Sequence, residues 1–201
     1  MRAIVNIRGC NGAGKSTIAL QMLESDPKME IVYLGVTSKG KPTYPAFTIF
    51  PTYNWIALGT YLNKTGGLDT MSTNEDTYST LLYVLKNYPN HNVLFEGVIS
   101  STIYSTWSRW LTHIQALYSQ DKVMIFNFIP PLEVCLARIQ LRNGGKPIKT
   151  ELVESKWNTV LKNAGLFKRD GLTSLKIDTS KYQLESMLDM FFRLVKKYTE
   201  E

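Results

Sequence analysis

Hydrophobic residues along the chain form two alternating patterns: short continuous runs, and longer segments in which they recur every three or four positions. The continuous runs, rich in β-branched residues, predict strands, and the spaced segments predict amphipathic helices. The predicted strands are residues 3–7, 30–36, 92–97, 122–129 and 172–178. The predicted helices are residues 18–24, 73–88, 102–118, 132–142, 149–164 and 183–198. Such an alternation indicates a three-layer α/β fold, in which a parallel sheet carries helices on both faces.

Residues 37–70 interrupt this alternation with several prolines and many threonines and tyrosines. Within them, residues 46–50 and 54–61 predict two short strands, which we expect to form a hairpin at a sheet edge, where proline is tolerated. Residues 63–70 follow as a loop with two glycines, an acid and hydroxyls, a composition typical of functional loops and also compatible with a plain turn. We expect residues 37–70 to be an insertion on the acceptor side of a single domain spanning residues 1–201.

Length and composition fit one globular domain: 201 residues, 44% hydrophobic and 20% charged,. No apolar run approaches the roughly 20 residues that span a bilayer. The chain begins directly with a strand, without a signal peptide, so we expect it to act in the cytoplasm and to have no membrane partner. A net charge of +6 favours polyanionic partners, although lysine and arginine can equally gather to hold a small phosphorylated ligand,.

A phosphate-binding loop lies directly after the first predicted strand. Residues 9–17, Gly-Cys-Asn-Gly-Ala-Gly-Lys-Ser-Thr, fit the pattern G-x-x-x-x-G-K-[ST], and a predicted helix follows,. Glycines let the backbone approach phosphates, Lys15 can reach the β- and γ-phosphates, and the Ser16 hydroxyl can ligate Mg²⁺. A chance glycine-rich turn would not require lysine and serine in register between a strand and a helix. We therefore predict ATP and Mg²⁺ as cofactors, with ATP bound by Gly9, Asn11, Gly12, Ala13, Gly14, Lys15, Ser16 and Thr17.

Three segments resemble the small nucleotide, nucleoside and polynucleotide kinases of the phosphate-loop superfamily, over nearly the whole chain. They are residues 9–17, residues 128–142 and residues 175–180, the last similar to the final strand before an adenine-contacting loop. The resemblance implies that Arg138 and Arg142, in a lid at residues 138–150, lie on the transferring phosphates. Guanidinium groups four residues apart share a helix face and suit phosphate oxygens, although a solvated helix face is the alternative.

Two carboxylates are candidates for the chemistry of transfer. Glu96 ends a predicted strand where the superfamily often has an acid, typically aspartate, and Asp69 lies in the glycine-containing loop. An acceptor hydroxyl needs a group that takes or orients its proton. We predict Asp69 as the base and Glu96 as the residue that serves Mg²⁺ or positions the acceptor, and the reverse assignment stays open.

The acceptor is predicted from what the sequence lacks and from a second resemblance. Thymidylate kinases have an Asp-Arg-[Tyr/Phe/His] motif that is absent from residues 100–110, where Arg109 is the candidate phosphate partner. The stretch 66–70, containing Gly66 and Gly67, and the Leu-Phe-Glu-Gly strand end are similar to a group of bacteriophage phosphate-loop kinases. Some of these phosphorylate the 5-hydroxymethyl group of hydroxymethyluracil in phage DNA. The resemblance thus implies transfer of the ATP γ-phosphoryl group to a primary hydroxyl.

Three functions remain open from the sequence. The first is a kinase that acts on modified pyrimidines in DNA, consistent with the basic charge and with aromatic residues that could stack on a base turned out of the duplex. The second is a kinase for free nucleosides or nucleoside monophosphates. The third is a nucleic-acid-binding module in which ATP only switches conformation, and the two acids and the arginine pair argue against it.

Overall fold

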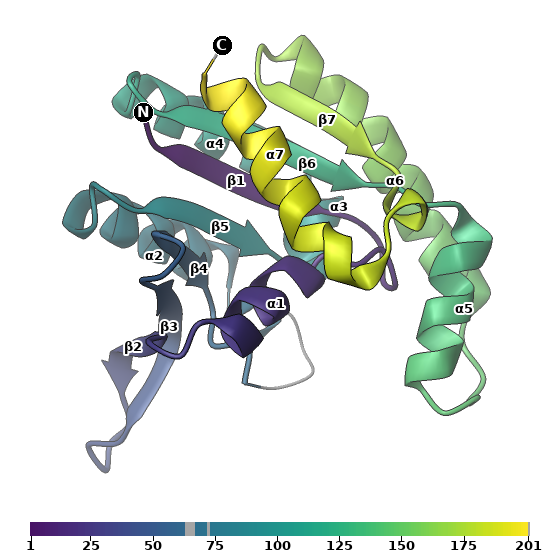
Figure 1. Cartoon of the computed structure of the whole chain (residues 1–201), viewed down its shortest axis with the longest axis horizontal. Helices are drawn as coiled ribbons and strands as arrows, with labels where there is room; N and C mark the ends of the chain where they lie inside the picture. Colours follow the sequence, from purple (N-terminus) through teal and green to yellow (C-terminus); the bar gives the residue numbers. More distant parts are fainter. Residues whose placement is uncertain (63–66, 72, 201) are drawn as a thin grey trace.

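The computed structural model describes residues 1–62, 67–71 and 73–200, with the main chain alone at Asp69, Thr70 and Ile99. A seven-stranded sheet in the order β2-β3-β4-β5-β1-β6-β7 runs through the molecule (Figure 1). Strands β4, β5, β1, β6 and β7 pair in parallel, whereas β3 pairs antiparallel with both β2 and β4. The strands are β1 (Ala3–Arg8), β2 (Glu30–Val36), β3 (Pro42–Phe50), β4 (Trp55–Leu58), β5 (Asn92–Glu96), β6 (Lys122–Phe128) and β7 (Thr173–Ile177).

Helices cover both faces of the sheet, as the alternating pattern predicts. Helices α1 and α7 lie on one face, and α2 and α4 lie on the other together with the end of α6 (Figure 1). The helices are α1 (Thr17–Ser25), α2 (Asn74–Asn87), α3 (Val98–Thr102), α4 (Ser105–Leu117), α5 (Leu132–Arg142), α6 (Thr150–Arg169) and α7 (Met187–Thr199). Three 3-10 turns are η1 (Gly67–Thr70), η2 (Thr179–Lys181) and η3 (Leu184–Ser186).

The hairpin expected at a sheet edge lies inside the sheet instead. Strands β3 and β4 do pair antiparallel, but β4 also pairs with β5, and β2 forms the edge beyond β3. Proline is tolerated in β3 because Pro42 and Pro45 fall in the half of the strand that extends past β4, with only β2 beside it,. Pro45, preceded by a cis peptide bond, lies where the register of β2 and β3 shifts.

The helix expected at residues 102–118 is present as α4, and a short helix that the sequence did not predict, α3, precedes it. Main-chain carbonyls at the junction of α3 and α4 accept hydrogen bonds from distant side chains. The Arg8 guanidinium donates to the carbonyl of Ile103 at 2.8 Å, and the Asn163 amide donates to that of Thr102 at 3.2 Å. These tertiary contacts turn the chain between the two helices, and hydrophobic spacing alone contains no sign of them.

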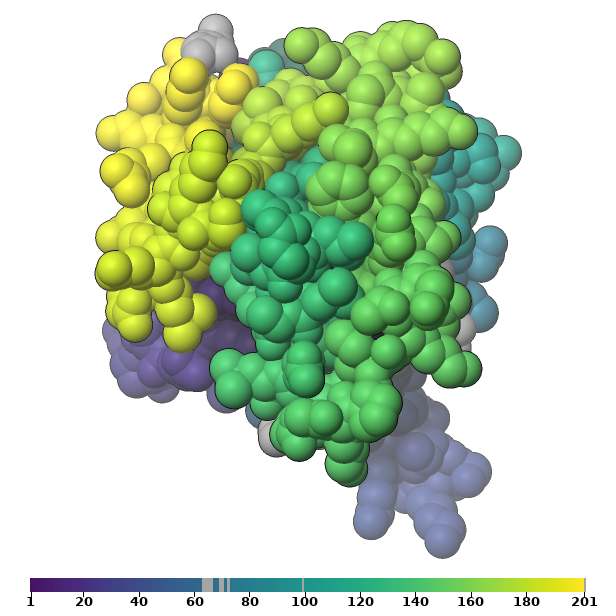
Figure 2. Space-filling model, turned by 90° about the vertical axis from the view of Figure 1, so that its right-hand side faces the viewer, coloured from purple at the N-terminus to yellow at the C-terminus, as the bar shows by residue number. Residues whose placement is uncertain are grey.

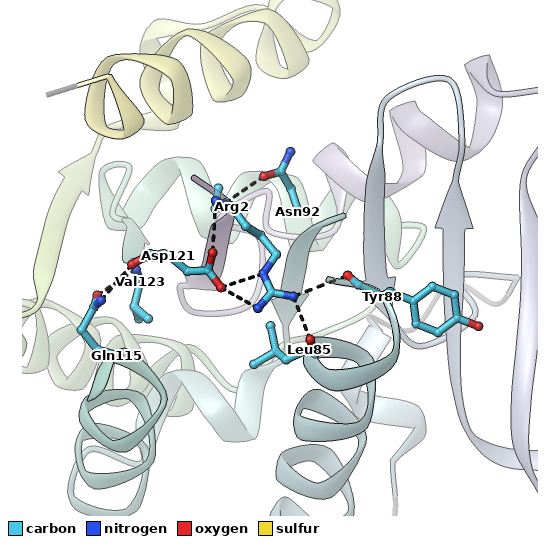
Figure 3. Close-up of polar contacts among 8 residues, drawn as sticks. Arg2, Leu85, Tyr88, Asn92, Gln115, Asp121 and Val123 are labelled. Atoms are coloured by element: carbon cyan, nitrogen blue, oxygen red, sulfur yellow. Dashed lines mark hydrogen bonds and ion pairs between the residues drawn. The ribbon is translucent and has the colours of Figure 1, made fainter. Parts of the chain in front are cut away.

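The amino end of β1 is held by a buried arginine (Figure 3). Arg2 is 7% exposed, and its guanidinium pairs with the Asp121 carboxylate, with an Nε–Oδ2 distance of 2.9 Å. It also donates to the main-chain carbonyls of Leu85 and Tyr88, at 2.9 and 3.4 Å. One side chain thereby ties β1 to the end of α2 and to the turn before β6, at the end of the sheet opposite the phosphate loop.

None of the helices in the described ranges is long and apolar enough to cross a membrane.

Candidate active site

The phosphate loop connects β1 to α1 and rests against α5. Gly12 and Gly14 have φ angles of 78° and 88°, in the left-handed region that glycine adopts without strain,. A Cβ atom added at Gly12 would lie 2.4 Å from the main-chain oxygen of Cys135. The loop is therefore shaped by close backbone packing as well as by its glycines, and it leads into the N-terminus of α1, where anions bind favourably.

Lys15 is folded over its own loop. Its side chain is 7% exposed, and Nζ donates a hydrogen bond to the carbonyl oxygen of Cys10 at 3.1 Å. The buried thiols of Cys10 and Cys135 are 3.4 Å apart. The pKa of the Cys10 thiol is lowered, chiefly by this hydrogen bond and further by the Lys15 ammonium, although burial opposes the change, and the pKa of Cys135 is raised,. A compact positive site thus lies where the phosphates of a nucleotide would bind.

A single carboxylate oxygen joins the phosphate loop to the loop after β4. Glu96 Oε1, fully buried at the end of β5, accepts hydrogen bonds from Ser16 Oγ and from the main-chain N–H of Gly67, both at 2.9 Å. The sheet brings these groups together because β5 is the parallel neighbour of β1, with Glu96 opposite Ile7. The hydroxyl and the carboxylate are hard oxygen ligands, the type that Mg²⁺ prefers, so this part of the site fits that ion.

Two glycines pack backbone to backbone beside Glu96. A Cβ atom at Gly67 would lie 2.2 Å from the carbonyl oxygen of Leu58, and one at Gly59 would lie 2.3 Å from that of Gly67. Both positions are therefore closed to any side chain. This close approach sets the start of η1, so that the predicted acceptor loop returns to the carboxyl end of the sheet.

The substitution Gly67→Ala is expected to move η1 away from Glu96, because the added methyl group would collide with rigid backbone. We expect a loss of at least about tenfold in phosphoryl transfer, measured with labelled ATP, since small misplacements of an active-site group are costly. Gly165→Ala is the matched control: nothing lies within 4 Å of a Cβ there, and alanine favours a helix,. Full activity of the Gly67 variant would contradict this interpretation.

Arg138 contacts the phosphate loop from α5. Its guanidinium donates to Thr179 Oγ1 at 3.1 Å and to the carbonyl of Gly12 at 3.4 Å, and the Thr179 hydroxyl in turn donates to the carbonyl of Ala13 at 3.0 Å. A cavity of about 270 Å³ opens beside these residues. Its lining residues are Gly14, Thr17, Arg138, Tyr182, Leu184 and Met187.

A fully buried cation lies directly before the loop. Arg8, at the end of β1, donates to Asn6 Oδ1 at 3.0 Å and lies 4.6 Å from the centre of the Phe167 ring. Burial lowers the pKa of its guanidinium to about 9, so the group remains protonated at neutral pH,. It adds a fixed positive charge behind the phosphate loop.

The structure brings most of the predicted site residues together, but two arginines lie apart. Arg142, the last residue of α5, and Arg109, on α4, are exposed, and within the described part of the chain neither forms a hydrogen bond or ion pair with the loop. The main chain of Asp69 lies in η1, two residues after Gly67, and its side chain is outside the described residues. Gly66 also lies outside the described residues.

Several residues at the site were not singled out by the sequence. Thr179, Tyr182 and Met187 follow β7 and line or brace the cavity, and only the resemblance of residues 175–180 to a strand before an adenine-contacting loop pointed towards them. Ser101 accepts the N–H of Gly9 at 3.1 Å through its hydroxyl. No sequence signal distinguished this serine from its neighbours.

A strand, a phosphate loop and a helix, with a buried acid on the neighbouring strand bonded to the loop serine, define a P-loop kinase. A solved structure agrees on the fold: YorR from Bacillus subtilis, in complex with phosphorylated GDP, superposes with a TM-score of 0.58 at 14% identity over 98% of both chains.

Residues 2–176 match the 5-hmdU DNA kinase family, and the chain belongs to that family. It is 40% identical over 196 residues to the 5-hmdU DNA kinase of Bacillus phage SP10 and 37% identical over 175 residues to that of Pseudomonas phage M6. It is 34% identical over 181 residues to 5-hmdU DNA kinase 1 of Salmonella phage ViI. These matches cover 96%, 84% and 83% of this chain, and 29%, 87% and 77% of the respective relatives.

Proposed function

We propose that this chain transfers the γ-phosphoryl group of ATP to the 5-hydroxymethyl group of hydroxymethyluracil in DNA. The observation that carries the proposal is the contact of Glu96 with both Ser16 and Gly67. It connects the phosphate loop to the loop that the sequence assigns to the acceptor, in a chain of the 5-hmdU DNA kinase family. The relatives' names supply the acceptor class.

The position of ATP follows from the loop and the adjoining cavity. The loop N–H groups and Lys15 bind the phosphates, and the N-terminus of α1 adds its positive end. The nucleobase occupies the cavity between Arg138 and Tyr182, whose planar groups suit an aromatic ring,. With the nucleobase in this cavity, Arg138 contacts the nucleotide beside the loop. Arg142, farther along α5, then closes on the transferring phosphates as part of the lid at residues 138–150.

Ser16 and Glu96 would hold Mg²⁺ together with the ATP phosphates. When bound, this ion neutralises charge on the β- and γ-phosphates. Among the residues that the structure describes, no three potential metal-ligating side chains form a cluster. A site with only Ser16 and Glu96 as protein ligands suits Mg²⁺, which usually takes one or two protein ligands and completes its shell with phosphate oxygens and water.

We assign Asp69 as the base and Glu96 as the carboxylate that serves the metal ion. The hydrogen bond from Ser16 to Glu96 supports the assignment of Glu96, because it couples the carboxylate to the hydroxyl that faces the metal. Asp69 would accept the proton of the attacking hydroxymethyl group, while the exposed Arg109 would contact the DNA backbone near the acceptor. A base within a duplex would have to turn out of the stack to reach this edge of the sheet.

The test is an acceptor panel with γ-labelled ATP and Mg²⁺. The acceptors are ordinary DNA, the same DNA containing hydroxymethyluracil, and free nucleosides and nucleoside monophosphates, including hydroxymethyldeoxyuridine. We expect label only in the modified DNA. Label in the small molecules alone would make the chain a nucleotide kinase, and ATP binding without any transfer would favour a nucleotide-switched binding module.

A further inference from the structure

The hairpin of β2 and β3 extends beyond the carboxyl ends of the parallel strands, where the site lies. The last described pair between β3 and β4 joins Phe47 to Leu58, so residues 42–46 continue past the carboxyl end of β4. Five residues of strand add about 16 Å. Figure 1 shows the hairpin projecting from the body, and in Figure 2, viewed at 90°, it again stands clear of the remaining surface. We call residues 33–44 the arm.

The arm is an ordered structure and not a loose loop. The N–H of Thr37 donates to the carbonyl of Lys41 at 2.8 Å, and that of Gly40 donates to the carbonyl of Thr37 at 2.9 Å. The Thr37 hydroxyl accepts the N–H of Lys41 at 3.0 Å. The tight turn therefore presents the exposed side chains of Lys39 and Lys41 from a fixed point at the tip.

Every charged residue of the arm is a lysine. The sequence contains no aspartate or glutamate between Glu30 and Asp69, a stretch that includes the whole arm. Apolar surface accompanies the lysines, since Val36 is 73% exposed and Tyr33 is 37% exposed. A positive tip with apolar sides complements a phosphate backbone and the sugars beside it, whereas it offers nothing to a basic or strongly polar partner.

The base of the arm is connected to the acceptor loop. The hydroxyls of Tyr44 and Thr60 are 3.1 Å apart, and Thr60 follows Gly59, which packs against Gly67. Strand β3 is three strand spacings from β1 in the sheet, about 14 Å,. A polymer whose target base enters beside η1 would therefore pass along the arm, while a free nucleotide in the same site would not reach it.

We infer that the arm binds the DNA duplex that carries the acceptor base, with Lys39 and Lys41 on phosphates and the ribbon lying in a groove. A two-stranded β-ribbon fits the major groove of B-DNA. This inference rests on the proposed function, and it makes the arm the part of the chain that distinguishes polymeric from free acceptors.

The test compares the double charge reversal Lys39→Glu/Lys41→Glu with Lys196→Glu/Lys197→Glu, which makes the same change in net charge on the last turn of α7. Binding to a fluorescent duplex containing hydroxymethyluracil is measured by anisotropy at several salt concentrations, without ATP, and affinity for ATP is measured separately. We expect the arm variant to bind DNA at least about tenfold more weakly at low salt. Its slope of log K against log salt should be smaller by about two, because roughly one counterion is released per phosphate contact. ATP affinity should stay at the wild-type value.

Equal DNA affinity and salt dependence in the two variants would overturn the inference. The arm would then not be a DNA-binding element. Because binding is measured without turnover, this result is separate from the acceptor panel. A wild type that binds the duplex through the arm and labels none of the acceptors would contradict the proposed function alone.

Discussion

Replacing Lys15 with alanine is expected to reduce phosphoryl transfer by about a thousandfold or more. The ammonium group is the positive side-chain charge of the loop: it is buried, and it lies 3.1 Å from the carbonyl oxygen of Cys10, within reach of the β- and γ-phosphates of a bound nucleotide,. Removing one preorganised donor from a site of developing negative charge typically costs 10²- to 10³-fold, and a full charge costs more. The measurement is the initial rate of label transfer from γ-labelled ATP at saturating acceptor.

The control for this prediction is Lys181→Ala, which removes an exposed lysine from η2. It should retain the wild-type rate. Thermal unfolding of the Lys15 variant separates a catalytic loss from a loss of structure, because only one hydrogen bond of the loop is lost. An unaltered transfer rate in folded Lys15→Ala protein would contradict the assignment of the phosphate loop.

Glu96→Gln is expected to lower the rate of transfer by about 10²- to 10³-fold and to raise the Mg²⁺ concentration required for half-maximal rate. Glutamine preserves the size of the side chain and an oxygen that can accept from Ser16 and Gly67, so the loops should keep their positions. It removes the negative charge, which would otherwise attract the ion. The experiment is a Mg²⁺ titration of the initial rate, with unfolding temperature as the check on structure.

The companion variant Asp69→Asn distinguishes the two acids. If Asp69 is the base, its variant should lose rate at every Mg²⁺ concentration, and the half-maximal Mg²⁺ concentration should stay at the wild-type value. The opposite pair of results, with the Mg²⁺ requirement changed by Asp69→Asn and unchanged by Glu96→Gln, would reverse the assignment of base and metal-side acid.

The local signals in the sequence were sufficient for the α/β layers and the phosphate loop. Strand, loop and helix are adjacent along the chain, and the glycines of residues 9–14, the lysine and the serine act through chemistry that their types and spacing already imply,. The runs of apolar residues identified five strands, and three of them, β1, β5 and β6, are buried on both faces, so they need no alternation,. Membership of the kinase family was likewise evident from short segments.

The sequence could not predict how distant segments meet. The short helix α3 before the expected helix was not predicted, and the carbonyls at the junction of α3 and α4 accept hydrogen bonds from Arg8 and Asn163, both remote in the chain. The expected edge hairpin is interior because β4 pairs with β5, a long-range parallel pairing that loop composition does not encode. The cavity beside Arg138 likewise combines residues from three segments that are far apart in the sequence.

By itself, the sequence determined the class of fold, the phosphate loop and the acids available for catalysis, since each depends on residues close together in the chain. Only the tertiary structure decided that one oxygen of Glu96 binds both Ser16 and Gly67, and that the arm continues past the end of β4. Both results depend on strand order and register, which are set by packing between segments far apart in the sequence.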